Sequence, residues 1–179
     1  MEKLKQSHDV TLEWHSFELR PKGSPPIPPE YLKRIEAARP RLLQIAREAY
    51  GLDLKPGPTG IDSRPALIGA KYAEANGQSE SYHVAMFQAY WQESKPIDDK
   101  QVLAEIAQTI GLDSVAFLAA LDNREYEDAV DADIERAYQY GLNGVPALVF
   151  NNKYLVSGAQ PYEVLRQVVE KVEAETNAT

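Results

Sequence analysis

The sequence predicts an α/β fold in which a strand, a long helical segment, a hairpin and a final helix follow one another along 179 residues. Three observations predict this order. Apolar residues alternate with a period close to two in residues 10–19 (VTLEWHSFEL), and they recur at helical spacing through most of residues 29–140. Two short apolar runs joined by the turn NNK then precede an amphipathic stretch at residues 160–175.

The first strand is expected at Val10–Leu19. Its alternation slips in phase once after Trp14, which indicates a bulge or a strand with both faces partly covered. Extended, proline-rich sequence follows at residues 20–30 (RPKGSPPIPPE) and predicts a loop before the helices begin.

The helical segment contains several amphipathic stretches separated by turn and cap residues. Pro40 is expected either to break residues 30–52 into two helices or to start the second of them. Asp113 is an expected N-cap, and Gly111 is expected just past the end of the helix before it. The expected inward stripes are Val84, Phe87 and Trp91; Val102, Leu103, Ile106 and Ile110; and Tyr126, Val130, Ile134 and Ala137 or Tyr138.

Near the C-terminus, the run Ala147–Phe150 and residues 153–158 (KYLVSG) predict an antiparallel hairpin, because the connection between them is short. Pro146 cannot donate to a sheet ladder and therefore belongs at the first residue of a strand or on an edge. Gly141 and Gly144 place a sharp turn just before it. The final helix should bury a stripe made of Val164, Leu165, Val168, Val169 and Val172.

Composition excludes several classes of function. The formal net charge is −8, and the 19 Lys and Arg residues are scattered, so no basic stripe for nucleic acid is expected. No apolar run approaches the roughly 20 residues of a membrane span, and the N-terminus has no apolar signal region, which predicts a cytoplasmic protein. The sequence has no cysteine, so disulfides, thiolate metal sites and thiol catalysis by these residues are excluded.

Few side chains form a recognisable catalytic pattern. His8, His15 and His83 lack metal-ligand spacing, and no metal site is predicted. The acidic residues at 125–135 could hold an acid/base pair, but a solvated helix face is favoured. A core position is favoured over a cleft wall for the aromatic set Tyr82, Phe87, Tyr90 and Trp91.

Several stretches together resemble the DsbA-like thioredoxin-fold family, in particular its cytoplasmic FrnE-type branch. Residues 144–150 (GVPALVF) and 154–165 (YLVSGAQPYEVL) resemble the C-terminal half of that family. Residues 10–21 resemble its second strand, and residues 63–78 and 85–113 resemble its inserted helices. The likeness extends from about residue 2 to residue 172, and related proteins include 2-hydroxychromene-2-carboxylate isomerases and kappa-class glutathione transferases.

The resemblance implies a thioredoxin-like fold of the DsbA type with a large inserted all-helical subdomain. Residues 1–23 would begin the thioredoxin-like domain, 24–140 would form the insertion, and 141–179 would close the domain with the hairpin and last helix. The family's first, central strand and its C-x-x-C segment would be missing from this sequence. The remaining sheet would then either close up, with residues 10–19 pairing antiparallel to 147–151, or take a strand from a partner chain, which favours a homodimer.

The resemblance also implies a site. Gly144, Val145 and Pro146 would form a cis-proline loop that docks an extended peptide or a thiol substrate. Ser157, Gly158, Ala159 and Gln160 would form the turn that, in the related transferases and isomerases, helps bind a glutathione carboxylate. No metal and no catalytic residue is expected, and glutathione is the alternative to having no cofactor.

The expected function is therefore that of a thiol-disulfide oxidoreductase family member that is redox-inactive over these residues. The alternatives are a non-catalytic peptide- or glutathione-binding protein and a glutathione-dependent isomerase or transferase relative. Within this expectation, a disulfide-reductase assay on this chain should show no turnover, because no thiol is present.

Overall fold

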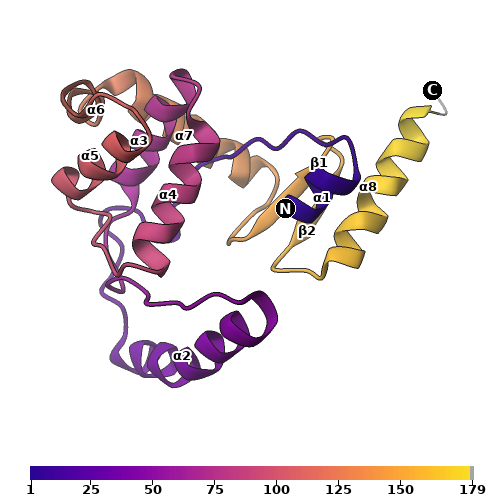
Figure 1. Ribbon diagram of the computed structural model, residues 1–179, viewed down its shortest axis with the longest axis horizontal. Helices are drawn as coiled ribbons and strands as arrows, with labels where there is room; N and C mark the ends of the chain where they lie inside the picture. Colours follow the sequence, from indigo (N-terminus) through magenta and orange to yellow (C-terminus); the bar gives the residue numbers. More distant parts are fainter. Residues whose placement is uncertain (178–179) are drawn as a thin grey trace. The chain divides into compact units, whose positions relative to one another are not determined.

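The computed structural model describes residues 1–177, which contain eight helices and two strands (Figure 1). Contacts divide the chain into two compact units. One joins Met1–Leu19 to the residues from Asp133 onward, and the other is Arg20–Ala132. The boundary between the units falls within helix α7 (Arg124–Gln139). The division at residues 23 and 140 that the sequence indicated stays a prediction.

The first unit is built on a hairpin of β1 (Ala147–Phe150) and β2 (Tyr154–Ser157). The strands pair antiparallel from Ala147 opposite Ser157 to Phe150 opposite Tyr154. Asn151 and Asn152 turn the chain with φ of 48° and 53°. Asparagine tolerates this left-handed conformation better than most residues, which explains why the sequence NNK forms the hairpin turn.

Helices α1 (Glu2–Ser7) and α8 (Tyr162–Asn177) provide the core of this unit. Leu4, Leu165 and Val169 are buried together, and the partly buried side chains packed against them are Val10, Leu148, Phe150, Val156 and Tyr162. Leu148, Phe150 and Val156 share one face of the hairpin because side chains alternate along a strand. The two helices come from opposite ends of the chain, and together they cover that face of the hairpin (Figure 1).

The prediction of a strand at Val10–Leu19 is wrong. The segment is extended, but within residues 1–177 the sheet contains only β1 and β2. A strand needs a neighbouring strand to fill its hydrogen-bond ladder, and alternation of apolar residues cannot supply one. Closure of the sheet by pairing of this segment with β1 is therefore also wrong, whereas pairing with a partner chain stays a proposal.

Side chains from α7 hold the extended segment instead. The Ser16 N–H donates to Asp133 Oδ2 at 2.8 Å, and His15 Nδ1 lies 2.7 Å from Asp133 Oδ1. Phe17 meets the Tyr138 ring edge-on at a centroid distance of 6.3 Å. Asp133 is buried, so the prediction that the acidic residues 125–135 form only a solvated face is wrong for this one residue.

The second unit contains α2 (Pro29–Tyr50), α3 (Arg64–Ala75), α4 (Ser79–Trp91), α5 (Lys100–Thr109), α6 (Ser114–Ala120) and the first part of α7. Helix α3 packs against α4, α5 and α6. Tyr82, Leu103 and Phe117 are fully or almost fully buried among them. Gly69 makes this packing feasible, because a Cβ there would overlap the Tyr82 hydroxyl and come within 2.6 Å of Phe117 Cζ.

Two sequence features of this unit have clear outcomes. The predicted N-cap is confirmed, because the Asp113 carboxylate accepts a 2.7 Å hydrogen bond from the Ala116 N–H. The predicted break at Pro40 is wrong, because α2 continues through it. Proline removes the N–H that would bond to the Glu36 carbonyl, and since Glu36 and Pro40 are both exposed, water can satisfy that carbonyl.

No helix within residues 1–177 combines the length and apolar character that crossing a bilayer requires.

Stability of this unit should depend on pH through His83. Its ring packs on Phe87 at a centroid distance of 4.5 Å, and burial lowers the pKa of His83 from 6.5 to about 4. Between pH 6.5 and 4 the unfolded chain then binds a proton that the folded chain does not, so the free energy of unfolding should fall as the pH falls. Urea unfolding at steps of pH should show a shallower dependence for His83→Gln, and identical slopes for both proteins would contradict this account.

Candidate functional site

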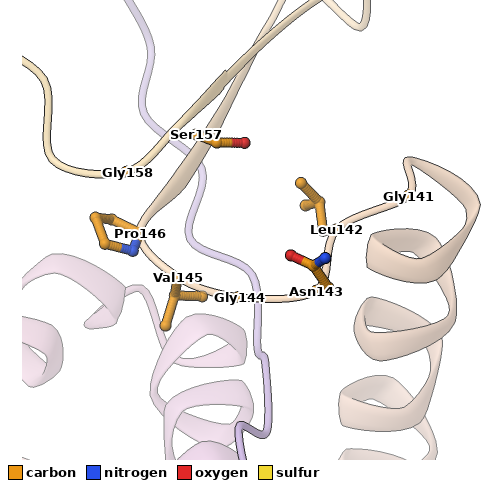
Figure 2. Close-up of a pocket in the computed structure, with 8 residues that line it drawn as sticks. All are labelled: Gly141, Leu142, Asn143, Gly144, Val145, Pro146, Ser157 and Gly158. Carbon is orange, nitrogen blue, oxygen red and sulfur yellow. The ribbon is translucent and has the colours of Figure 1, made fainter.

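A pocket of about 230 Å³ lies at the open end of the hairpin, where the chain enters β1 and leaves β2. Figure 2 shows Leu142, Asn143 and Ser157 extending toward this space, with Val145 and Pro146 on its other side. The residues that line it are Gly141, Leu142, Asn143, Gly144, Val145, Pro146, Ser157 and Gly158. None of these side chains is charged, so the Asn143 amide, the Ser157 hydroxyl and the main chain are its polar groups.

Main-chain pairing continues past the hairpin into this pocket. The Gly158 N–H donates to the Pro146 carbonyl at 2.8 Å, which holds the two chain segments together beyond the last strand residues. Gly158 has φ of 79° and Gly141 has φ of 71°, a conformation that favours glycine over residues with a Cβ. The Val145–Pro146 peptide bond is cis.

Val145 presents unpaired main-chain groups beside the pocket. Val145 is 51% exposed, and neither its N–H nor its C=O has a hydrogen-bond partner within residues 1–177. The Pro146 carbonyl points toward β2, and alternation along the strand then points the main-chain groups of Ala147 and Val149 to the opposite edge. No described strand pairs with that edge. An added strand could therefore pair with β1 at this edge.

The turn that precedes α8 has some groups that favour anion binding and others that oppose it. The Gly158 N–H is already bonded to Pro146, and the Gln160 side chain donates to the Ser157 carbonyl at 2.9 Å. The N–H groups of Ala159 and Gln160 have no acceptor within the described chain, which leaves two donors near a helix N-terminus. Glu163 in the first turn of α8 opposes an anion there, although Arg166 pairs with it at 2.9 Å.

Comparison with known proteins identifies the family. A family model described as "DSBA-like thioredoxin domain" matches residues 1–170. The chain belongs to the DSBA-like thioredoxin domain family. Its fold is the thioredoxin-like DsbA fold, mostly helical and with a small two-stranded sheet among the described residues.

Three similar proteins place this DSBA-like domain among its relatives. YwbO of Bacillus subtilis is 28% identical over 169 residues, which cover 90% of this chain and 82% of that protein. A crystal structure of a probable DsbA oxidoreductase from Streptomyces coelicolor superposes with a TM-score of 0.73 at 28% identity, covering 82% of this chain and 65% of that one. The structure of a 2-hydroxychromene-2-carboxylate isomerase gives a TM-score of 0.80 at 23% identity, covering 99% and 88%.

The length covered differs among these relatives. This DSBA-like domain spans most of YwbO but slightly less than two thirds of the Streptomyces DsbA oxidoreductase chain. The likeness to the isomerase structure lies below 25% identity and describes the fold alone.

The pocket brings together most of the residues predicted as a site. Gly144, Val145 and Pro146 line one side, and Ser157 and Gly158 line the other. Ala159 and Gln160 follow directly in the chain and are exposed, but they do not line the pocket. The assignment of these residues to substrate binding stays a prediction.

Leu142 and Asn143 line the pocket without having been predicted. The glycines on either side of them signalled a turn, but nothing in the sequence distinguishes these two side chains from ordinary loop residues. Their position becomes visible only once the hairpin register sets Pro146 opposite Gly158.

A second polar cluster in this unit joins His15 and Asp133. The His15 side chain is 41% exposed, its Nδ1 faces the buried Asp133 carboxylate, and its Nε2 lies 3.8 Å from Glu13 Oε2. An imidazole oriented in this way by a carboxylate can serve as a general base, but no described hydroxyl bonds to its Nε2. Its contacts therefore indicate an anchor for residues 10–19. No group of three or more potential metal ligands occurs within residues 1–177.

Proposed function

We propose that the pocket docks the main chain of an extended peptide, with Val145 as the pairing residue. The observation that carries this proposal is the unpaired N–H and C=O of an exposed Val145 beside an unpaired edge of β1. Addition of a strand to an exposed edge uses main-chain hydrogen bonds for affinity and accepts many sequences. A lining without charged side chains agrees with such broad recognition.

In a DsbA-like thiol-disulfide oxidoreductase, this docking would hold a substrate in place for disulfide exchange. Exchange begins with attack of a thiolate on a disulfide sulfur. The sequence has no cysteine, so the thiolate would have to belong to the substrate, to a small thiol or to residues outside this sequence. We propose that the chain belongs to the FrnE-type branch of this family and lies in the cytoplasm. The motifs at residues 10–21, 63–78 and 144–150, which resemble that branch, support this proposal.

Glutathione is the second candidate ligand of the same site. The unpaired N–H groups of Ala159 and Gln160, next to Ser157 and Gly158, favour a carboxylate of a small peptide at the start of α8. Binding of glutathione in preference to longer peptides would favour the isomerase and transferase relatives over the oxidoreductases.

The two ligands can be separated by nuclear magnetic resonance on the full chain. Titration with a capped, thiol-free pentapeptide of alternating valine and serine should shift the Val145 amide and slow its hydrogen exchange. Titration with glutathione should shift Ala159 and Gln160 more strongly than Val145. Each main-chain hydrogen bond contributes about 0.5–1.5 kcal/mol, so pairing with both groups of Val145 corresponds to about fivefold to 100-fold in affinity.

Filling the pocket should weaken this binding. Ser157 extends into the pocket and is exposed, so Ser157→Tyr should weaken peptide binding by about tenfold while the hairpin remains folded. Lys153→Tyr, at the turn end of the same hairpin, is the matched control and should bind normally. Peptide binding that is unchanged in Ser157→Tyr, or that leaves the Val145 amide unshifted, would disprove the proposal.

A further inference from the structure

A groove of about 300 Å³ lies within the Arg20–Ala132 unit, between α2 and the C-terminal end of α4. Helix α2 contributes Ile35, Ala38, Arg39 and Leu42. The loop that follows α2 and the end of α4 contribute Pro56, Gly57, Thr59, Tyr90 and Trp91. The lining is apolar except for one arginine, one threonine and the tyrosine hydroxyl.

The floor of this groove is held by specific contacts. The Lys55 N–H donates to the Trp91 carbonyl at 2.6 Å, and the Gly57 N–H donates to the Tyr90 carbonyl at 2.7 Å. The Tyr90 hydroxyl donates to the Pro58 carbonyl at 3.0 Å. A Cβ on Gly57 would lie 2.7 Å from the Tyr90 ring, so glycine permits the ring to lie against the loop. These bonds fix an aromatic floor, in which Tyr90 and Trp91 meet edge-on at 5.1 Å.

Arg39 is the charged residue of the lining. Its guanidinium reaches Thr59 Oγ1 at 3.4 Å, and no carboxylate pairs with it within residues 1–177. Burial raises the pKa of Tyr90, and the positive charge of the neighbouring Arg39 acts in the opposite direction. A half-buried cation without a counter-charge, at the edge of an apolar surface, attracts an anion strongly. The chain as a whole is acidic, so this positive site is local.

We propose that this groove binds an apolar molecule that carries one carboxylate, with the carboxylate on Arg39 and the apolar part on Tyr90 and Trp91. Volumes of 300–1,000 Å³ are typical of small-molecule sites, and this groove lies at the lower end of that range. The site is independent of the hairpin pocket, because its residues all belong to the other unit.

The fluorescence of Trp91 provides a direct test. The chain has two tryptophans, so Trp14→Phe leaves Trp91 as the single reporter. Decanoate, decanol and decyltrimethylammonium would be titrated below their micelle concentrations. Decanoate should change the Trp91 emission with saturation, while decanol should bind at least about tenfold more weakly and the cation should not bind, because hydrogen bonds to a charged partner are the strong ones.

Arginine variants locate the anion. Arg39→Gln should weaken decanoate binding by about tenfold or more without changing decanol binding, and Arg39→Lys should restore part of the preference. Arg41→Gln, an exposed arginine on the same helix, is the matched control and should behave as the parent. Circular dichroism would verify that each variant folds like its parent.

Several results would overturn the proposal. Absence of saturable binding would do so, as would equal binding of decanoate and decanol. Loss of binding in Arg41→Gln as well as Arg39→Gln would show a general charge effect instead of a site. A dimer by sedimentation, with Trp91 shielded from an added quencher before any ligand is present, would identify a second copy as the occupant.

Discussion

Replacement of Phe117 by alanine should lower the free energy of unfolding of the Arg20–Ala132 unit by about 3–5 kcal/mol. The Phe117 ring has no exposed surface. It meets the Tyr72 ring edge-on at 5.8 Å and lies 5.9 Å from the Tyr82 ring. Because α3, α4 and α6 all contribute to this contact, the surrounding helices cannot collapse into the space without losing other contacts, and the cost should lie in the upper part of that range.

Urea unfolding followed by Trp91 emission, in a Trp14→Phe background that leaves Trp91 as the single tryptophan, would measure this loss. Val115→Ala is the matched control on the same helix, because Val115 is 75% exposed and its replacement should change stability by less than about 0.5 kcal/mol. Hydrogen exchange at Leu148 and Val156 would report the other unit at the same time. A loss below about 1 kcal/mol for Phe117→Ala would show that the packing around the ring is not as tight as its burial indicates.

Helices of this protein were predictable where one face is clearly apolar. In α8, the predicted residues Leu165 and Val169 are buried, whereas Val164 at the edge of the predicted stripe is exposed. In α4, by contrast, apolar residues surround most of the helix, so periodicity could not select a face. Val84 and Phe87 were predicted to point inward but are 55% and 51% exposed, whereas Tyr82 is buried.

The extended segment at residues 10–19 shows a different limit. Its alternation correctly indicates an extended chain, but whether such a chain is a strand depends on a neighbour elsewhere in the fold. Its contact with Asp133 joins residues more than a hundred positions apart, and one carboxylate within an acidic stretch carries no local signal of burial.

The candidate pocket was more accessible to prediction than either of these features. Gly144 and Pro146 mark a turn at the entrance to a strand, and a turn as short as NNK fixes the register that sets Pro146 opposite Gly158. These local signals indicate the turn and the hairpin, whereas the expectation of a binding site at Gly144–Pro146 and Ser157–Gln160 came from the family resemblance. The groove between α2 and α4 had no such signal, because its walls are separated by a loop whose path the sequence does not specify.

Replacement of Asp133 by alanine should destabilise the unit that contains the hairpin by about 2–4 kcal/mol. Asp133 is 7% exposed, and its carboxylate bonds to both the Ser16 N–H and the His15 ring. Hydrogen bonds to a charged group contribute about 1.5–3 kcal/mol, and the change would leave the N–H of Ser16, itself a buried residue, without this acceptor. Asp133→Asn should cost less, because its amide oxygen can still accept from Ser16.

The loss should appear first in the extended segment. Hydrogen exchange of the Ser16 amide should become faster in Asp133→Ala, and the emission of the nearby Trp14 should approach that of the unfolded chain. Asp128→Ala is the matched control, because Asp128 lies on the same helix in an exposed ion pair with Arg124 at 3.6 Å and should contribute less than about 0.5 kcal/mol. If the Ser16 amide exchanged equally slowly in the parent, in Asp133→Ala and in Asp128→Ala, another contact would have to hold residues 10–19, and Asp133 would not be their anchor.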